Sequence, residues 1–279
     1  MSRVYYSRRT GKSPEISSID LDMLLRLFAA VYSNFLNRDY FQEAFGYDCV
    51  DAGLVPGIVG SDVGAYMFRK LRRDLWPIHK RVMDFSEDDL FDVIEFLYDL
   101  VSKPIGGWFH QFSDCGWHYN QFDASAGRDE FRQEINEILL GYSDGYELNT
   151  SGELVFSGDP GLKELLDEDS PEFDPLNVDK KLEYAVRRFR HHRASVEDKQ
   201  EAVRVLADVL EFLRPNVEIL LTKKDAGDLY NIANNYGIRH HNLSQKNDYE
   251  KDIFLKWIFY SYLATIRLSV DIISKGSKA

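Results

Sequence analysis

Apolar residues recur at every third or fourth position over most of this chain, which is the spacing of helices that bury one face. In the first half such segments cover residues 19–45 and 63–76, the stretch after Ser86, and residues 129–140. In the second half they cover residues 178–192, the stretch after Ser195, residues 225–236, and a long last helix after Asn247. The pattern predicts a mostly α fold, whose second half is a bundle of four or five helices.

Residues at the expected helix ends support these boundaries. Ser86 and Ser195 each precede acidic residues, as N-cap residues do. Gly237 suits the left-handed conformation that closes the helix over residues 225–236. Asn247 and Glu250 together resemble a capping box at the start of the last helix.

One β-hairpin is predicted over residues 145–156, where two short strands flank a turn rich in Asn, Ser and Gly. An acidic, proline-containing stretch follows over residues 159–174, and we place a boundary near residue 170. The predicted organisation is a helical N-terminal region over residues 1–142, the hairpin with an acidic linker over 143–175, and a helical bundle over 176–279.

The composition of the 279 residues, 44% hydrophobic, is that of a globular protein able to bury a sizeable core. The first residues contain no apolar leader segment, so we expect a cytoplasmic protein with two free thiols, Cys49 and Cys115. The longest apolar run, residues 253–266, is interrupted by Lys256 and Ser261. It is therefore expected to be a buried helix or a subunit interface, with no membrane partner.

Charge is distributed unevenly between the two halves. From Asp179 onward there are 18 basic and 14 acidic residues, a net charge of +4. Because the whole chain has a net charge of −12, residues 1–178 have a net charge of −16. A polyanion such as RNA is therefore expected to bind only the second half. The same distribution is also typical of two differently charged, solvated surfaces.

The segment Arg239-His240-His241-Asn242 carries the residue types that metal-free phosphodiester chemistry uses. One imidazole can accept a proton while the other donates one, and the guanidinium can hold a phosphate. Asn235 and Asn242 could position the backbone of the substrate. The alternative is that the histidines only cap or join the two flanking helices.

A second basic run covers residues 187–193. On a continuous helix Arg188 and His192 would share one face and could contact a phosphate backbone. A solvated helix end, where basic residues are favoured by the helix dipole, explains the run better.

His110, Cys115 and His118 form half of a zinc-binding pattern. Cys49 is distant in sequence, and the aromatic residues around residues 108–119 favour packing instead. No nucleotide-binding loop or metalloprotease motif is present. We therefore expect neither a metal ligand set nor a cofactor, and a zinc-stabilised regulator is the weaker alternative.

Residues 228–242, Tyr249 and residues 257–266 together resemble the HEPN domain, a small helical fold of RNA-processing and RNA-binding proteins in bacterial defence and toxin systems. Residues 115–119 and 145–148 are similar to the leading region of abortive-infection proteins with such a tail. The resemblance implies a homodimer that cleaves RNA without metal through an Arg and a His of each subunit. In the family the His follows the Arg at a spacing of four to six residues. Here two histidines follow Arg239 directly, whereas Arg187 and His192 in the second basic run meet that spacing.

The sequence thus predicts a metal-independent ribonuclease or RNA-binding effector in bacterial anti-phage defence. His240 and His241 would act as acid and base, and Arg239 would stabilise the charged transition state. The alternative is a non-catalytic module that assembles through its helical tail, while its acidic half senses a phage or host protein.

Overall fold

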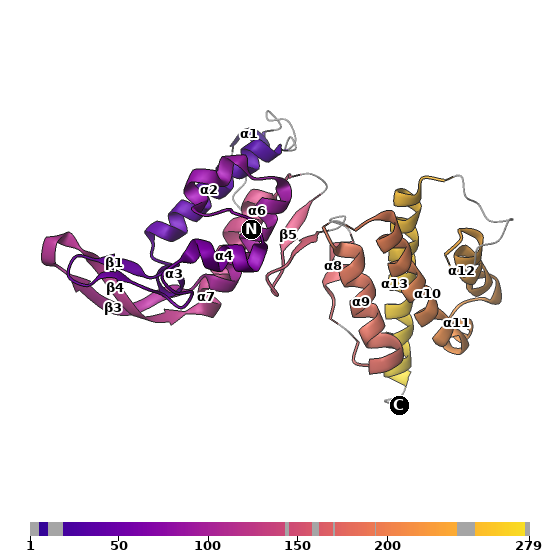
Figure 1. Ribbon diagram of the computed structural model, residues 1–279. Helices are drawn as coiled ribbons and strands as arrows, with labels where there is room; N and C mark the ends of the chain where they lie inside the picture. The colour runs from indigo at the N-terminus through magenta and orange to yellow at the C-terminus, as the bar shows by residue number, and fades with distance from the viewer. Residues whose placement is uncertain are drawn as a thin grey trace. The chain divides into compact units, whose positions relative to one another are not determined.

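A computed structural model gives the fold of this chain as two compact units, Met1–Phe156 and Ser157–Ala279, each with its own apolar core (Figure 1). The prediction of a mostly α fold is confirmed. Strands occur, in the part of the chain that the structure describes, only as three two-stranded antiparallel sheets. The described residues are 6–10, 19–142, 145–157, 162–169, 171–192, 194–238 and 249–276.

The helices of the first unit pack around a core rich in aromatic side chains. The single helix expected over residues 19–45 is two helices, because Asp39 has a φ of 60° that no α-helix accommodates. Ser86 forms the capping box of α6 with Asp89, as its sequence context predicts. The helices are α1 (Tyr6–Arg9), α2 (Leu21–Asn37), α3 (Gln42–Phe45), α4 (Val63–Leu71), α5 (Ile78–Arg81), α6 (Glu87–Leu100) and α7 (Ala124–Leu139).

Two of the three hairpins have no counterpart in the sequence prediction. The larger one joins two eight-residue strands, and its register shifts at Gly106. Its residues are mostly exposed or half-buried, so they lack the alternation of apolar and polar positions that identifies a strand. The strands are β1 (Tyr47–Cys49), β2 (Gly53–Val55), β3 (Lys103–His110), β4 (Gly116–Asp123), β5 (Tyr146–Leu148) and β6 (Leu154–Phe156).

The predicted hairpin, β5–β6, is present and belongs to the first unit. Leu148 and Leu154 are buried in the first core, and the Tyr98 hydroxyl donates to the Thr150 carbonyl at 2.8 Å. The chain therefore divides after Phe156, whereas the sequence pattern grouped the hairpin with a linker and put the boundary near residue 170.

In the second unit α10 packs against α9, α11, α12 and α13, as Figure 1 displays. Ser195 caps α10 with Asp198 in a second capping box. Pro215 was expected only to follow the end of α10. It lies instead in the first turn of a further helix, α11, where proline is tolerated. The elements are α8 (Lys163–Asp167), the π-helical turn η3 (Pro175–Asp179), α9 (Lys180–Arg190), α10 (Val196–Phe212), α11 (Arg214–Leu220), α12 (Lys223–Asn235) and α13 (Lys251–Gly276).

Helix α13 is long and apolar enough to cross a membrane, the one such helix among the residues that were placed. Slightly more than half of its apolar window, 56%, is buried within the protein. Arg267, near its C-terminal end, is buried and donates to the carbonyl groups of Glu168 and Asp169 at 2.6 and 3.0 Å. These contacts are typical of the core helix of a bundle.

Candidate functional site

Two cysteines and two histidines of the first unit meet at one point. The possible ligand atoms of Cys49, His110, Cys115 and His118 all lie within 4.8 Å of one another. Cys49 Sγ is 3.8 Å from His110 Nδ1, and Cys115 Sγ is 3.3 Å from His118 Nε2. These four side chains include both cysteines of the chain.

The register of the β3–β4 hairpin brings three of the four together. His118 pairs with Trp108, and His110 lies two positions further along β3 on the same face of the hairpin. The two imidazole centroids are consequently 5.2 Å apart. Cys115 lies in the turn between the strands and so reaches the same face.

The fourth residue, Cys49, comes from the neighbouring β1–β2 hairpin. The Tyr47 ring packs on the His118 ring with a centroid distance of 4.2 Å. Gln42 fixes the edge of β4: its amide donates to the Trp117 carbonyl at 3.0 Å and accepts from the Tyr119 N–H at 2.7 Å. The amide thus substitutes for a backbone partner and holds α3 against β4.

The carboxylate of Asp51 lies next to the imidazole of His110, on the side away from Cys49. Asp51 Oδ2 is 3.2 Å from His110 Nε2, while Nδ1 of the same ring points to Cys49. Such a carboxylate orients a ring whose other nitrogen binds a partner. His118 is buried, with an exposed fraction of 5%.

The sequence argument treated Cys49 as distant and lone, and this was wrong. It is 61 positions from His110 in sequence but in contact with it in space. The spacing of Cys115 and His118 was the available signal. The missing information was the pairing of two short hairpins, neither of which the apolar pattern predicts.

The segment Arg239-His240-His241-Asn242 lies outside the described residues. The residues just before it are fixed to α10: Gln200 donates to the Gly237 carbonyl at 3.0 Å, and Arg204 donates to the Ile238 carbonyl at 3.2 Å. Gly237 has a φ of 66°, the left-handed conformation expected of it. Asn235 is exposed at the end of α12.

The second basic run is partly used for structure. Arg188 Nη2 contacts Asp198 at 2.9 Å and its Nη1 donates to the Tyr184 hydroxyl, while the buried Arg190 pairs with Asp167 at 2.8 Å. α9 ends at Arg190 because His191 has a ψ of 131°. His192 therefore lies beyond the helix, so the helical face expected for Arg188 and His192 is not formed.

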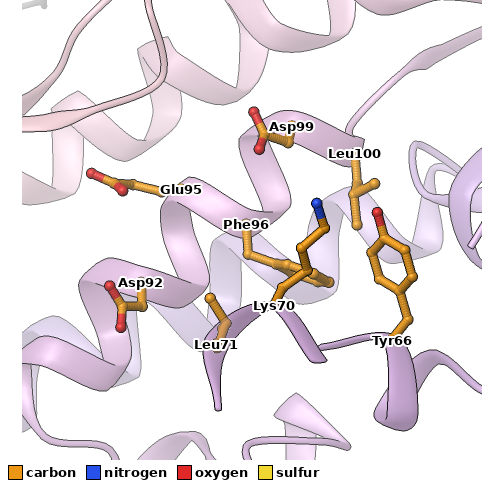
Figure 2. A pocket seen from close by; sticks show the side chains of 8 residues that line it. All are labelled: Tyr66, Lys70, Leu71, Asp92, Glu95, Phe96, Asp99 and Leu100. Atoms are coloured by element: carbon orange, nitrogen blue, oxygen red, sulfur yellow. The ribbon is translucent and has the colours of Figure 1, made fainter. Parts of the chain in front are cut away.

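A cavity of about 230 Å³ lies between α4 and α6 in the first unit. Figure 2 shows Asp92, Glu95 and Asp99 along α6, while Lys70 and Tyr66 line the cavity from α4. Burial raises the pKa of Glu95, whose carboxylate accepts from the Leu154 N–H at 2.6 Å. Three carboxylates would repel a phosphate backbone, so this cavity does not suit RNA.

Comparisons of the chain with models of known protein families, with curated proteins and with solved structures found no match. These comparisons therefore neither support nor exclude an RNA-processing family. The assignment of function depends on the chemistry of the residues themselves.

Proposed function

We propose that the second unit acts on RNA through Arg239, His240, His241 and Asn242, as a metal-independent ribonuclease of HEPN type in bacterial defence. The observation that supports this proposal is the way in which the bundle anchors both ends of the segment that contains them. Before it, Arg204 and Gln200 hold Ile238 and Gly237 on α10. After it, the Tyr249 hydroxyl donates to the Tyr236 carbonyl at 2.9 Å.

These contacts hold Tyr249 beside Tyr236, close to Gly237 and Ile238. The Tyr249 ring also packs on Tyr236 and Phe254, with centroid distances of 5.2 and 5.3 Å. Ile238 is buried, and its N–H donates to the Ala233 carbonyl at 3.0 Å. Fixed ends reduce the conformational freedom that catalytic side chains lose when substrate binds.

The charge near this anchor suits a phosphate. Arg204 approaches the Ile238 carbonyl with Nε, and its side chain remains 44% exposed, although it also pairs with Glu201. In the proposed reaction one histidine removes the proton of the ribose 2′-hydroxyl and the other protonates the leaving oxygen. Arg239 stabilises the charge on phosphorus, and Asn235 and Asn242 position the backbone.

Arg188 and His192 are proposed as a separate contact with the RNA backbone. Asp198, which binds Arg188, and Gln200, which binds Gly237, are two positions apart on α10 and so about 200° apart around it. Arg188 and Gly237 thus contact the same end of α10 on different faces. One subunit is therefore not expected to combine Arg188 with the histidines after Arg239 in a single site.

The test is cleavage of total RNA and tRNA by the full chain, with EDTA and in a parallel series without chelator. Arg239→Ala and the double variant His240→Ala, His241→Ala should each reduce the rate by at least about 100-fold. Arg214→Ala is the matched control, because this arginine lies on α11, pairs with Glu211 and Glu218, and packs over the Tyr230 ring. Equal cleavage by all variants would refute the assignment of the site.

A specific feature of α13 favours the second candidate function, a module that assembles with a second copy of itself. An exposed apolar stripe follows one face of this helix and consists of Ile253, Trp257, Ala264, Leu268 and Ile272. In the proposed homodimer this stripe is the contact. Trp257→Glu with Leu268→Glu should convert a dimer into a monomer by light scattering, whereas Lys275→Glu should not. A wild-type monomer would exclude the dimer.

A further inference from the structure

We propose that Cys49, His110, Cys115 and His118 bind one zinc ion, which joins the β1–β2 and β3–β4 hairpins of the first unit. This inference is independent of the RNA function, because all four residues lie in the other unit. It is also the one group of its kind among the residues whose placement is described.

The spacing of the ligand atoms fits a small tetrahedral ion. Zinc binds thiolate sulfur at about 2.3 Å and imidazole nitrogen at about 2.0–2.1 Å, so the edges of its tetrahedron are about 3.3–3.8 Å long. Two of the four sulfur–nitrogen separations are 3.3 and 3.8 Å, and no ligand pair exceeds 4.8 Å. Closure of the site therefore requires only small side-chain rotations.

The donor set selects zinc over other common divalent ions. Two sulfur and two nitrogen donors suit zinc, whereas calcium and magnesium require oxygen donors. Binding releases the two thiol protons to solvent, and the two thiolates neutralise the charge of the ion. Four protein ligands leave no position for a substrate, so the site is structural.

Asp51 completes the arrangement as an outer partner. Its carboxylate is 3.2 Å from His110 Nε2, the nitrogen that does not face Cys49. A histidine bound to zinc commonly donates its other N–H to a carboxylate, which fixes the ring and strengthens its bond to the metal.

The hairpins need such a connection because they have little core of their own. β3 contains no buried residue, and His118 is the one buried residue of β4. Trp108, Phe112 and Trp117 are all about half exposed or more. A two-stranded hairpin is marginally stable without packing, so a bound ion supplies the stabilisation that apolar burial does not.

The first experiment measures the metal content of the full chain, produced with zinc in the medium and purified without chelators or metal-affinity resin. We expect one zinc per chain. Cys115→Ser and His110→Gln should each lower the content to less than about a tenth. His79→Ala is the matched control, since His79 is exposed on α5 and is not part of the four-residue cluster, and it should retain the ion.

A second measurement does not depend on the folding of the ligand variants. Asp51→Asn leaves all four ligands in place at an exposed position, so the variant should fold and still bind zinc. Its affinity in a chelator competition should fall about 10–100-fold. Cobalt added to the wild-type apoprotein should give the charge-transfer absorption of thiolate ligands.

Three outcomes would overturn the proposal. A zinc-free chain with two reactive thiols would mean that the cluster is held only by hydrogen bonds. A zinc-free chain with no reactive thiol would indicate a bond between Cys49 and Cys115. Full zinc content in Cys115→Ser would place the ion elsewhere.

Discussion

Glu130 on α7 connects three elements of the first unit through one carboxylate. Lys103 Nζ at the start of β3 lies 2.6 Å from Oε1, and the Tyr40 hydroxyl donates to Oε2 at 2.5 Å. Arg38, just after α2, donates to the same Oε2 at 2.8 Å and lies over the Tyr40 ring. We predict that Glu130→Gln, which keeps the shape but removes the charge, destabilises the first unit.

The magnitude follows from the pKa of the carboxyl group. The hydrogen bonds from Lys103 and then Tyr40 lower the pKa of Glu130 from 4.5 to about 2. A shift of this size corresponds to about 3 kcal/mol of unfolding free energy without screening. Because the side chain is 32% exposed, solvent screens the network and we expect about 1–2 kcal/mol at neutral pH.

The pH dependence has a definite sign. A carboxyl whose pKa is lower in the folded state stabilises the fold above its unfolded pKa, and the contribution disappears as pH falls through the folded pKa. For Glu130 the loss should occur between about pH 4.5 and about pH 2. The wild type should therefore approach the stability of Glu130→Gln at the acidic end of this window.

Urea unfolding followed by tryptophan fluorescence is the appropriate assay, because Trp76, Trp108 and Trp117 all lie in the first unit. Glu137→Gln is the matched control, since Glu137 is an exposed acid on the same helix. A loss in Glu130→Gln no larger than in this control would refute the reasoning. So would a difference that persists unchanged near about pH 2.

Two further changes test the packing of each unit. Gly152→Ala would place a Cβ 2.3 Å from Tyr98 Cδ1 at a φ of 85°, whereas Gly53→Ala has a similar φ of 67° and open space. Both should cost about 1–3 kcal/mol from backbone strain in urea unfolding, and Gly152→Ala should cost more because of the clash. Equal losses would show that backbone conformation alone decides. Phe259→Ala removes a buried ring stacked on Phe189 at 3.8 Å and should destabilise the second unit by about 3–5 kcal/mol, without lowering the fluorescence-detected midpoint of the first. A shared shift of both transitions would contradict independent cores.

Helices with a regular apolar stripe and a strong cap were predictable from sequence. Ser86 and Ser195 are each followed by acidic residues, a pattern that predicts a helix start, and both form the expected capping boxes. Gly237 takes the predicted left-handed conformation for an equally local reason. These features depend only on residues within one helical turn.

Features that depend on contacts between distant residues were not predictable. Nothing near Cys49 indicates His110, because their contact requires two hairpins to pair first. The exposed, aromatic β3–β4 strands resemble a loop when read by apolar alternation. The prediction that Arg188 and His192 share a helical face was wrong for a different reason, because α9 ends between them at Arg190.

The hydrogen bonds from Arg267 to the carbonyls of Glu168 and Asp169 have a consequence for synthesis of the chain on the ribosome. Arg267 is 99 positions from Glu168 and 98 positions from Asp169 in sequence. Its helix, α13, supplies much of the second core. At translation speeds of about 5–20 residues per second, roughly 5–20 s separate the synthesis of Glu168 from that of Arg267. Helices α9–α12 are made within this interval and wait for part of it until α13 covers them. Their apolar faces are meanwhile available to chaperones, whereas the first unit is already complete in the nascent chain.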